Sequence, residues 1–216
     1  MNQAHFFRTF SVMSLFSMIL LIFLGYFLYN QIHAIIYDLN LAKNREQAER
    51  LATLISINLE SGRASSAVLQ EVQRMLENTP QSSEHFACII ADPGRVIAHP
   101  KPSNVNKDTT GWTINNGIEQ KTYTQSAGEG VAFGGVQTRV DGSQDITYQV
   151  PISTKPWSVC VHTDLDLIAG QTTVIMERVS WIVAPGVLLI TFFGAFYMSR
   201  RKKPEASSED SLHLVS

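Results

Sequence analysis

His99 and Lys101 stand two positions apart, directly after the short apolar run 96–98. An imidazole and an ammonium can together hold an anionic ligand such as a carboxylate. Trp112, Arg139 and Tyr148 are further candidates, because an aromatic wall with one guanidinium is a common way to bind a small organic anion. Each has a structural alternative: His99 as a hydrogen bonder that ends a strand, Tyr148 as a core residue, and Arg139 as a solvent-facing cation. These five residues form the candidate ligand-binding set.

Other kinds of chemistry find little support in the sequence. His162, Asp164 and Asp166 alternate like metal ligands, but three polar residues at a strand exit are more typical of a solvated turn and helix cap, so no metal is expected. The chain lacks a Gly-rich phosphate loop, a nucleophile elbow and a Cys–His signature. We therefore expect no catalytic residue, no cofactor and no enzyme, although a hydrolytic or redox enzyme remains a third hypothesis. A net charge of −2 argues against nucleic acid as a partner.

The composition points to a membrane protein. Of 216 residues, 44% are hydrophobic and only 17% are charged, whereas a soluble domain usually carries about 25% charged residues. Residues 10–29 contain no charge, and about 20 helical residues span a hydrocarbon core of ~30 Å. The alternative is a cleaved signal peptide after Arg8. However, the run exceeds the ~7–15 apolar residues of a signal, and no clear A-x-A cleavage site follows.

A second apolar segment covers 181–198 and contains Pro185, which predicts a kink or the point where the helix enters the bilayer. The four cations Arg200, Arg201, Lys202 and Lys203 follow it. Such a cluster is a stop-transfer and positive-inside signal, so the C-terminus is expected in the cytoplasm. Two spans then put the N-terminus inside as well and the middle of the chain outside.

The expected domain order follows from these two spans. A cytoplasmic N-terminus (1–9) precedes the first transmembrane helix (10–30), and an extracytoplasmic domain (31–178) precedes the second transmembrane helix (179–199). A short cytoplasmic tail (200–216) ends the sequence, and nothing in it can bury a core.

The extracytoplasmic segment has the pattern of an α+β domain. Apolar stripes at helical spacing predict a long helix over 31–60 and a shorter one over 67–77. Alternating or apolar runs separated by the turn sequences Asp92-Pro93-Gly94 and Asp141-Gly142 predict five antiparallel strands, at 86–91, 95–98, 130–140, 146–152 and 157–162. The segment 113–126 could be a helix or irregular. With the helices on one side, this is an α+β sandwich.

Two segments carry a family resemblance. DPGRVIAHPKPSNVNKD resembles the hairpin of bacterial extracytoplasmic Cache domains, and STKPWSVCVHTDLDLI is similar to the last strand of that family and its acidic turn into the exit helix. The resemblance covers about 150 residues. It implies a PAS-like, single-Cache domain with a long N-terminal helix. It also implies that this domain lies in the periplasm, between two transmembrane helices of a bacterial inner membrane. It places His99 and Lys101 at the rim of the ligand pocket.

The sequence also departs from the family. The tyrosine, arginine and tryptophan motif of the amino-acid-binding branch is missing, so an amino-acid ligand is not carried over. The usual HAMP, kinase, cyclase, phosphatase or methyl-accepting domain does not follow the second span. The protein is therefore expected to relay its signal to a separate membrane partner, or to be a receptor that has lost its output domain.

The resemblance makes the strands that hold Cys88 and Cys160 central neighbours in the sheet. In an oxidising compartment the pair could form a disulfide or a redox switch. The alternative is two buried thiols, which we favour because cysteine is a comfortable small core residue and cross-strand disulfides are geometrically demanding.

The expected function is that of a membrane-anchored periplasmic sensor. A small ligand, expected to be an organic anion, would bind the domain and bias the position of the second span, and a kinase, diguanylate cyclase or phosphatase would supply the output. The alternative is an envelope structural or assembly protein that uses the same fold to dock proteins. Small residues at Thr191, Ala195 and Ser199 give a weak indication of a homodimer.

Overall fold

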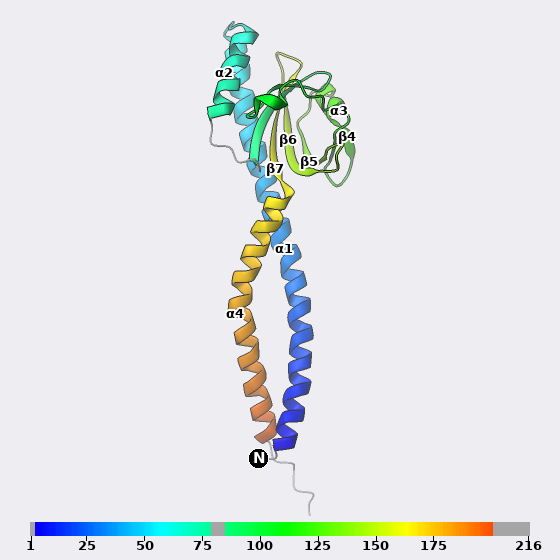
Figure 1. Ribbon diagram of the computed structural model, residues 1–216, viewed down its shortest axis with the longest axis vertical. Coiled ribbons are helices and arrows are strands. Elements are labelled where there is room, and N and C mark those ends of the chain that lie inside the picture. The colour runs from blue at the N-terminus through cyan, green and yellow to red at the C-terminus, as the bar shows by residue number, and fades with distance from the viewer. Residues whose placement is uncertain (1–2, 79–84, 201–216) are drawn as a thin grey trace, which may run out of the picture. The chain divides into compact units, whose positions relative to one another are not determined.

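A computed structural model describes residues 3–78 and 85–200 (Figure 1). The chain divides into two compact units. We refer to Gln31–Thr172 as the sheet unit, and to Met1–Asn30 together with Thr173–Ser216 as the helical unit. The basic residues Arg201, Lys202 and Lys203, and the rest of the tail, lie outside the described residues.

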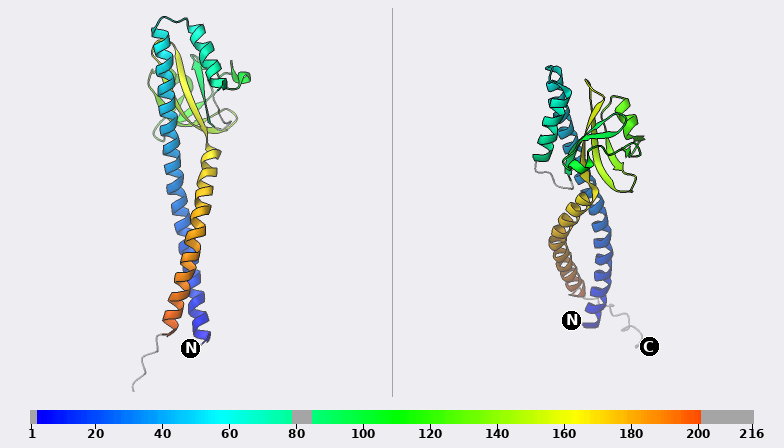
Figure 2. Two further views of the ribbon diagram at one scale, coloured as in Figure 1. Left: turned by 90° about the vertical axis from the view of Figure 1, so that its left-hand side faces the viewer. Right: turned by 45° about the horizontal axis from the view of Figure 1, so that its top comes forward.

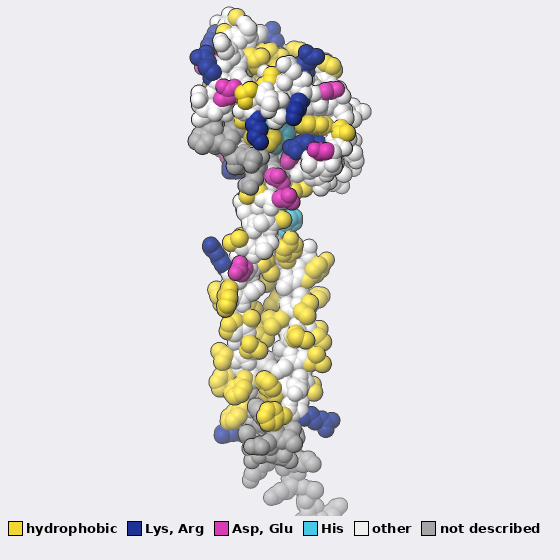
Figure 3. All heavy atoms as spheres, in the orientation of Figure 1, with side chains coloured by type: hydrophobic (Ala, Val, Ile, Leu, Met, Phe, Trp, Pro, Cys, Tyr) yellow, Lys and Arg dark blue, Asp and Glu magenta, His cyan; other side chains and the backbone are white. Residues whose placement is uncertain are grey.

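The helical unit contains the first half of α1 (Gln3–Glu60) and most of α4 (Leu165–Arg200). Each helix includes a stretch that is long and apolar enough to cross a membrane. Figure 3 shows hydrophobic side chains along both helices of this unit. Phe16, Phe23 and Ile190 are among those that face outward, as expected where lipid rather than water is the solvent. Two candidate membrane spans are therefore present.

Small polar side chains join the two helices within the helical unit. Ser17 Oγ lies 2.8 Å from Thr191 Oγ1, and the Thr191 hydroxyl donates to Val187 O over 2.8 Å. Because the Thr191 proton is used in this way, Ser17 is the donor across the helix pair. Ala195 is fully buried. Of the small-residue stripe that suggested a dimer, Thr191 and Ala195 therefore face the protein's own α1, and the Ser199 side chain lies outside the described residues.

The sheet unit is built on one antiparallel sheet in the order β2-β1-β7-β6-β5-β3-β4. Five of its strands match the predicted ones: β1 (His85–Ala91), β2 (Arg95–Ala98), β5 (Phe133–Thr138), β6 (Gln144–Ile152) and β7 (Trp157–Asp164). Short turns connect β1 to β2, β5 to β6 and β6 to β7.

The prediction of five strands is too low, because the sheet has seven. The short strands β3 (Thr113–Asn115) and β4 (Gln120–Thr122) occupy part of the segment 113–126, for which the sequence predicts a helix or irregular structure. The turn between them is closed by Asn115, whose Oδ1 accepts from Gly117 N over 2.8 Å, and by Asn116, whose Oδ1 accepts from Ile118 N over 2.9 Å. Asparagine side chains stabilise turns in this way.

One face of the sheet is covered by α1 and by α2 (Ser65–Asn78). Figure 2 shows these two helices side by side against the strands. Val68, Val72 and Leu76 recur at helical spacing on α2 and are all buried, as the amphipathic pattern predicts. They pack with Ile55 of α1 and with the β1 and β7 residues that point to the same face. We call this the helix-covered face.

The opposite face is covered by loops, by the short 3₁₀ helix η1 (Pro102–Asn104) and by α3 (Tyr123–Gly128). Thr122 and Gln125 form a capping box that starts α3, which satisfies two backbone donors at the helix start. Tyr123 is buried and packs with Cys88 and Cys160 of the sheet. We call this the pocket face, because the pocket described below opens on it.

The last strand continues directly into α4. Asp164 at the end of β7 accepts a hydrogen bond from Asp166 N over 2.8 Å, which caps the first turn of the helix. Ile168 in the next turn is fully buried and packs with Ile36 of α1 and Ile146 of β6. A displacement of β7 would therefore reach α4 through a continuous backbone.

The β3 backbone lies so close to Gly135 of β5 that one added methyl group should lower the stability of the protein. A Cβ at this position would lie 2.2 Å from Asn115 O, on the β3 backbone. We expect Gly135→Ala to lower the free energy of unfolding by about 2 kcal/mol, because β3 must move away from β5. Urea unfolding of the full chain in detergent measures this. Gly128→Ala is the control, since a Cβ there meets nothing within 4 Å; equal losses for both variants would contradict the prediction.

Candidate functional site

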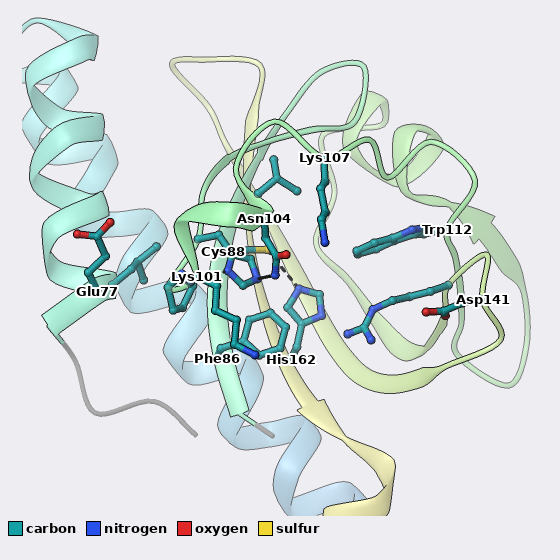
Figure 4. A pocket seen from close by; sticks show the side chains of 14 residues that line it. Glu77, Phe86, Cys88, Lys101, Asn104, Lys107, Trp112, Asp141 and His162 are labelled. Atoms are coloured by element: carbon teal, nitrogen blue, oxygen red, sulfur yellow. Dashed lines mark hydrogen bonds between the residues drawn. The ribbon is translucent and has the colours of Figure 1, made fainter. Parts of the chain in front are cut away.

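A pocket of about 470 Å³ opens on the pocket face of the sheet unit. Its volume lies within the range of ~300–1,000 Å³ that is typical of small-molecule sites. Strand residues supply the floor and one wall, with Phe86 and Cys88 from β1 and His162 from β7. The loop after β2 supplies His99, Lys101 and Lys107, and the pocket also contains Trp112, Arg139 and the acidic residues Glu77 and Asp141. Figure 4 shows Lys107 reaching into the pocket from the loop, with Trp112 and Asp141 on one side and Glu77 on the other.

At the end of β2, both the backbone and the ring of His99 form hydrogen bonds. Its backbone N–H donates to Gln73 Oε1 over 3.0 Å, and its carbonyl accepts from Gln73 Nε2 over 2.9 Å. Its ring Nδ1 accepts from Lys101 N over 2.9 Å, and its Nε2 lies 3.2 Å from the Asn104 amide. The strand-ending role that the sequence left open for His99 is therefore present, and the ring also lines the pocket.

These contacts determine the proton position on His99. Because Nδ1 accepts a backbone N–H, the neutral ring carries its proton on Nε2. The Asn104 atom nearest Nε2 is Nδ2, at 3.2 Å, so the amide group has to be turned over for its oxygen to accept this proton. Burial lowers the pKa of His99 from 6.5 to about 4, and the nearby cations Lys101, Lys107 and Arg139 act in the same direction. At neutral pH the ring is an uncharged part of the rim.

No carboxylate of the described residues neutralises the two rim lysines. Within residues 3–78 and 85–200, neither Lys101 nor Lys107 forms an ion pair. Asp141 instead accepts hydrogen bonds from Ser143 N over 3.0 Å and from Ser143 Oγ over 2.7 Å, and these contacts lower its pKa. Two unpaired ammonium groups therefore face the pocket and are available to a negatively charged ligand.

Arg139 serves a different purpose, because its charge is already balanced. Its guanidinium donates to the Asp145 carboxylate and to Ser143 Oγ, the latter over 3.0 Å. It lies 5.4 Å from the centre of the Trp112 ring, in a cation–π arrangement. Asp145 is only 4% exposed in its side chain; burial raises its pKa, while Arg139 opposes that rise. Arg139 thus pairs a buried carboxylate and supports the Trp112 wall.

The structure brings together four of the five predicted ligand-binding residues. His99, Lys101, Trp112 and Arg139 all line the pocket. Tyr148 lies apart from them, packed against the helix-covered face with Arg45 of α1 at 5.9 Å from its ring. Tyr148 therefore packs against the core, which is the structural alternative that the sequence offers for it.

Other pocket residues were not among the candidates. Lys107 belongs to the segment that resembles the Cache hairpin, which is the one signal that could have identified it. Phe86 stacks on His162 with ring centres 4.8 Å apart, and its ring centre also lies 5.0 Å from that of His99. Nothing in a short apolar strand distinguishes such a phenylalanine from an ordinary core residue. The predicted neighbourhood of Cys88 and Cys160 is confirmed, since they are direct partners across β1 and β7, and both are free thiols.

No protein-family model and no curated protein matches this sequence. Several solved structures do. A methyl-accepting chemotaxis protein from Vibrio parahaemolyticus is 13% identical, with 65% of this chain and 98% of that chain covered and a TM-score of 0.45. A Cache chemosensory domain described for carboxylic acid recognition is 14% identical, with 59% and 96% covered and a TM-score of 0.38.

The extracellular domain of a putative histidine kinase is also similar, at 13% identity and a TM-score of 0.36, with 47% of this chain and 38% of that domain covered. These proteins are sensor domains, and the likeness concerns the fold alone. The α+β class drawn from the sequence is confirmed by the antiparallel sheet and the helices that cover it. The similar structures include a Cache domain, the family that the sequence resembles, and the single-Cache type stays a prediction.

The histidines of the sheet unit predict acid sensitivity. Burial is the main cause that lowers the pKa of His85, of His99 to about 4, and of His162 well below 6.5. The folded protein thus keeps these rings neutral where the unfolded chain binds protons. We expect the free energy of unfolding to be nearly constant between about pH 7 and 8 and to fall as the pH drops from about 6.5 to about 4. For His99 the loss is on the order of 2 kcal/mol, since a tenfold change in proton affinity corresponds to about 1.4 kcal/mol and its rim position screens part of the effect.

Urea unfolding of the full chain across this pH range measures the loss, and His99→Gln serves as the comparison. The variant should show a flatter dependence on pH between about 6.5 and 4. Parallel curves for the variant and the natural protein would contradict the assignment to His99.

Proposed function

We propose that the protein is a membrane-anchored sensor whose Cache-like domain binds a small organic anion. The observation that carries this proposal is the pocket with two ammonium groups, Lys101 and Lys107, that form no ion pair with any described residue. Trp112 and Phe86 add aromatic walls, which suit the carbon skeleton of such a ligand. The neutral His99 and the Asn104 amide offer polar contacts at the rim.

Two ammonium groups in one pocket favour a ligand with more than one negative charge. A carboxylate that accepts hydrogen bonds from an ammonium gains a charge-assisted interaction, which contributes roughly 1.5–3 kcal/mol. Glu77 and Asp141 lie on opposite sides of the pocket (Figure 4). Their charges would repel a large polyanion that filled the whole pocket, so a compact di- or tricarboxylate fits best.

The same proposal includes a route for the signal. His162 of the pocket lies on β7, and β7 continues without a break into α4. A ligand that binds one arrangement of β7 more tightly shifts the population of arrangements, by a coupling of about 1–3 kcal/mol in typical cases. In this proposal the shift moves α4 relative to α1, and a membrane kinase, diguanylate cyclase or phosphatase supplies the output.

A melting-temperature screen of the full chain in detergent tests ligand binding. The probes are acetate, succinate, citrate, inorganic phosphate and sulfate, with the uncharged succinamide as a matched control. We expect a rise in melting temperature with at least one carboxylate, because a ligand that binds only the folded state stabilises it by mass action. No rise with any of these anions, or an equal rise with succinamide, would count against an anion sensor.

The proposed topology places the Cache-like domain in the periplasm and both termini in the cytoplasm. A reporter inserted after Glu77 distinguishes the two sides of the membrane. Alkaline phosphatase should be active at this position, because it needs the oxidising periplasm to form its disulfides. A fluorescent protein that folds only in the cytosol should stay dark there, and the reverse result would overturn the topology.

A further inference from the structure

Two thiols lie side by side at the floor of the pocket. Cys88 and Cys160 are direct partners across the antiparallel strands β1 and β7, and the two side chains are within hydrogen-bonding distance of each other. Directly opposed residues have Cα atoms about 4.5–5.5 Å apart, and a disulfide requires about 4.4–6.8 Å. Backbone geometry therefore allows a bond between them without separating the strands.

One thiol is reachable from the pocket. Cys88 lines the pocket beside His162, whereas Cys160 is fully buried behind it. A small molecule that enters the pocket can therefore contact the sulfur of Cys88 first. Cys88 is 2% exposed and lines the pocket, so it would react first, and Cys160, which is 0% exposed, would then act as the resolving cysteine.

Hydrogen bonds fix which way the protons point around these thiols. The Thr147 hydroxyl donates to Val161 O over 3.2 Å, so at 3.2 Å it accepts from Nδ1 of His162. The Asp145 carboxylate, 3.8 Å from the same Nδ1, also favours a proton there. The neutral ring then has an acceptor at Nε2, which lies 3.3 Å from Cys88 Sγ and takes the thiol proton.

We propose that Cys88 and Cys160 form an oxidisable pair, and that their disulfide releases Nε2 of His162 to the pocket as an open acceptor. The oxidant is a disulfide of the glutathione class or of a thiol oxidoreductase. The Cys88 thiolate attacks one sulfur of that disulfide and releases a thiolate; the Cys160 thiolate then attacks Cys88 Sγ and releases the second. Two protein thiols are oxidised, one external disulfide is reduced to two thiols, and the two protons pass to the leaving groups.

The surroundings set the rate and the consequence of this reaction. The neighbouring Cys160 thiol and burial raise the pKa of Cys88, so the exchange is slow at neutral pH and faster as the pH rises. Once the bond forms, Cys88 no longer has a proton to donate, and His162 must find another donor. The effect on ligand choice rests on the proposed function, whereas the oxidation itself does not.

Thiol counting on the full chain in detergent tests the chemistry. The protein is incubated with oxidised glutathione, unfolded and alkylated, and its mass is measured before and after reduction. We expect both cysteines to resist alkylation, a mass lower by two hydrogens, and a monomer on a non-reducing gel. Cys160→Ser and Cys160→Ala should instead keep a glutathione adduct on Cys88, because no resolving thiol is present.

Two outcomes would overturn the proposal: full alkylation of both cysteines after oxidation, or a disulfide between two chains. In a separate experiment, nitrogen NMR of the full chain with labelled histidine records the imidazole signals. The His162→Gln variant identifies which of these signals belong to His162. The imidazole signals of His162 should change on oxidation in the natural protein and stay unchanged in Cys160→Ala. A failed ligand screen combined with a formed disulfide would reject the anion sensor and leave the oxidisable pair in place.

Discussion

Replacing Arg139 with alanine should destabilise the protein by about 3 kcal/mol. Arg139 pairs with Asp145, whose side chain is 4% exposed, and removing one member of a buried ion pair leaves an uncompensated charge. The carboxylate that remains would take up a proton more readily, because burial already raises the pKa of Asp145 and Arg139 opposes that rise. The loss of stability should therefore shrink as the pH falls toward the range where Asp145 is protonated.

Urea unfolding of the full chain measures this effect, and Arg63→Ala is the matched control. Arg63 pairs with Glu71 at the surface, with both side chains largely exposed, so its loss should change the free energy of unfolding by less than about 1 kcal/mol. Similar values for the two variants would show that the Arg139–Asp145 pair does not stabilise the pocket wall.

Removing both rim ammonium groups should abolish most of the affinity for an anionic ligand. Each charge-assisted hydrogen bond contributes roughly 1.5–3 kcal/mol, and each 1.4 kcal/mol is about a tenfold change in affinity. For the double variant Lys101→Gln, Lys107→Gln we therefore expect at least a ~100-fold rise in the dissociation constant of the carboxylate that most raises the melting temperature. Stability without ligand should change little, because neither lysine forms an ion pair among the described residues.

Lys155→Gln is the control for this variant. Lys155 is exposed and lies outside the pocket, so affinity should stay within about twofold. Isothermal titration of the three proteins at low and high salt provides the comparison. If the double variant binds the anion as tightly as the natural protein does, the anion does not contact the rim lysines.

Local signals account for much of what the sequence predicted correctly. The strand β2 occupies the predicted residues Arg95–Ala98, because the Asp92-Pro93-Gly94 turn marks its start and the His99-Pro100 pair its end. The turn at Asp141-Gly142 likewise separates β5 from β6, and Gly142 has the positive φ of 83° that this dipeptide favours. Such dipeptides act within a few residues, so the sequence alone reveals them.

The short strands β3 and β4 were not predicted, because the hairpin that they form is very short and joins the sheet through a distant strand. Each has three residues, and β3 joins the sheet through β5, about 20 positions further along the chain. Thr113, Ile114 and Asn115 form too brief an alternation to distinguish a strand from a loop. β3 and β4 pair with each other in a short hairpin, and only the position of β5 joins that hairpin to the rest of the sheet.

In the candidate site, too, the sequence reveals neighbours along the chain but not residues that the fold brings together. His99 and Lys101 belong to one run, so the sequence groups them, whereas topology alone brings Arg139 to the same pocket. Alternation puts Ile146, Tyr148 and Val150 on one face, but it does not say which face the helices cover. Since Tyr148 opposes Val161 on the helix-covered face, it lies away from the pocket.

Fluorescence of Trp112 is the most direct test of the pocket as the ligand site. In a full chain with Trp157→Phe and Trp181→Phe, Trp112 is the remaining tryptophan, and it lines the pocket beside Arg139. Titration with succinate or citrate should give a saturable change in emission that the Lys101→Gln, Lys107→Gln variant loses. Emission that stays constant while a carboxylate still raises the melting temperature would contradict the account, because the anion would then bind elsewhere.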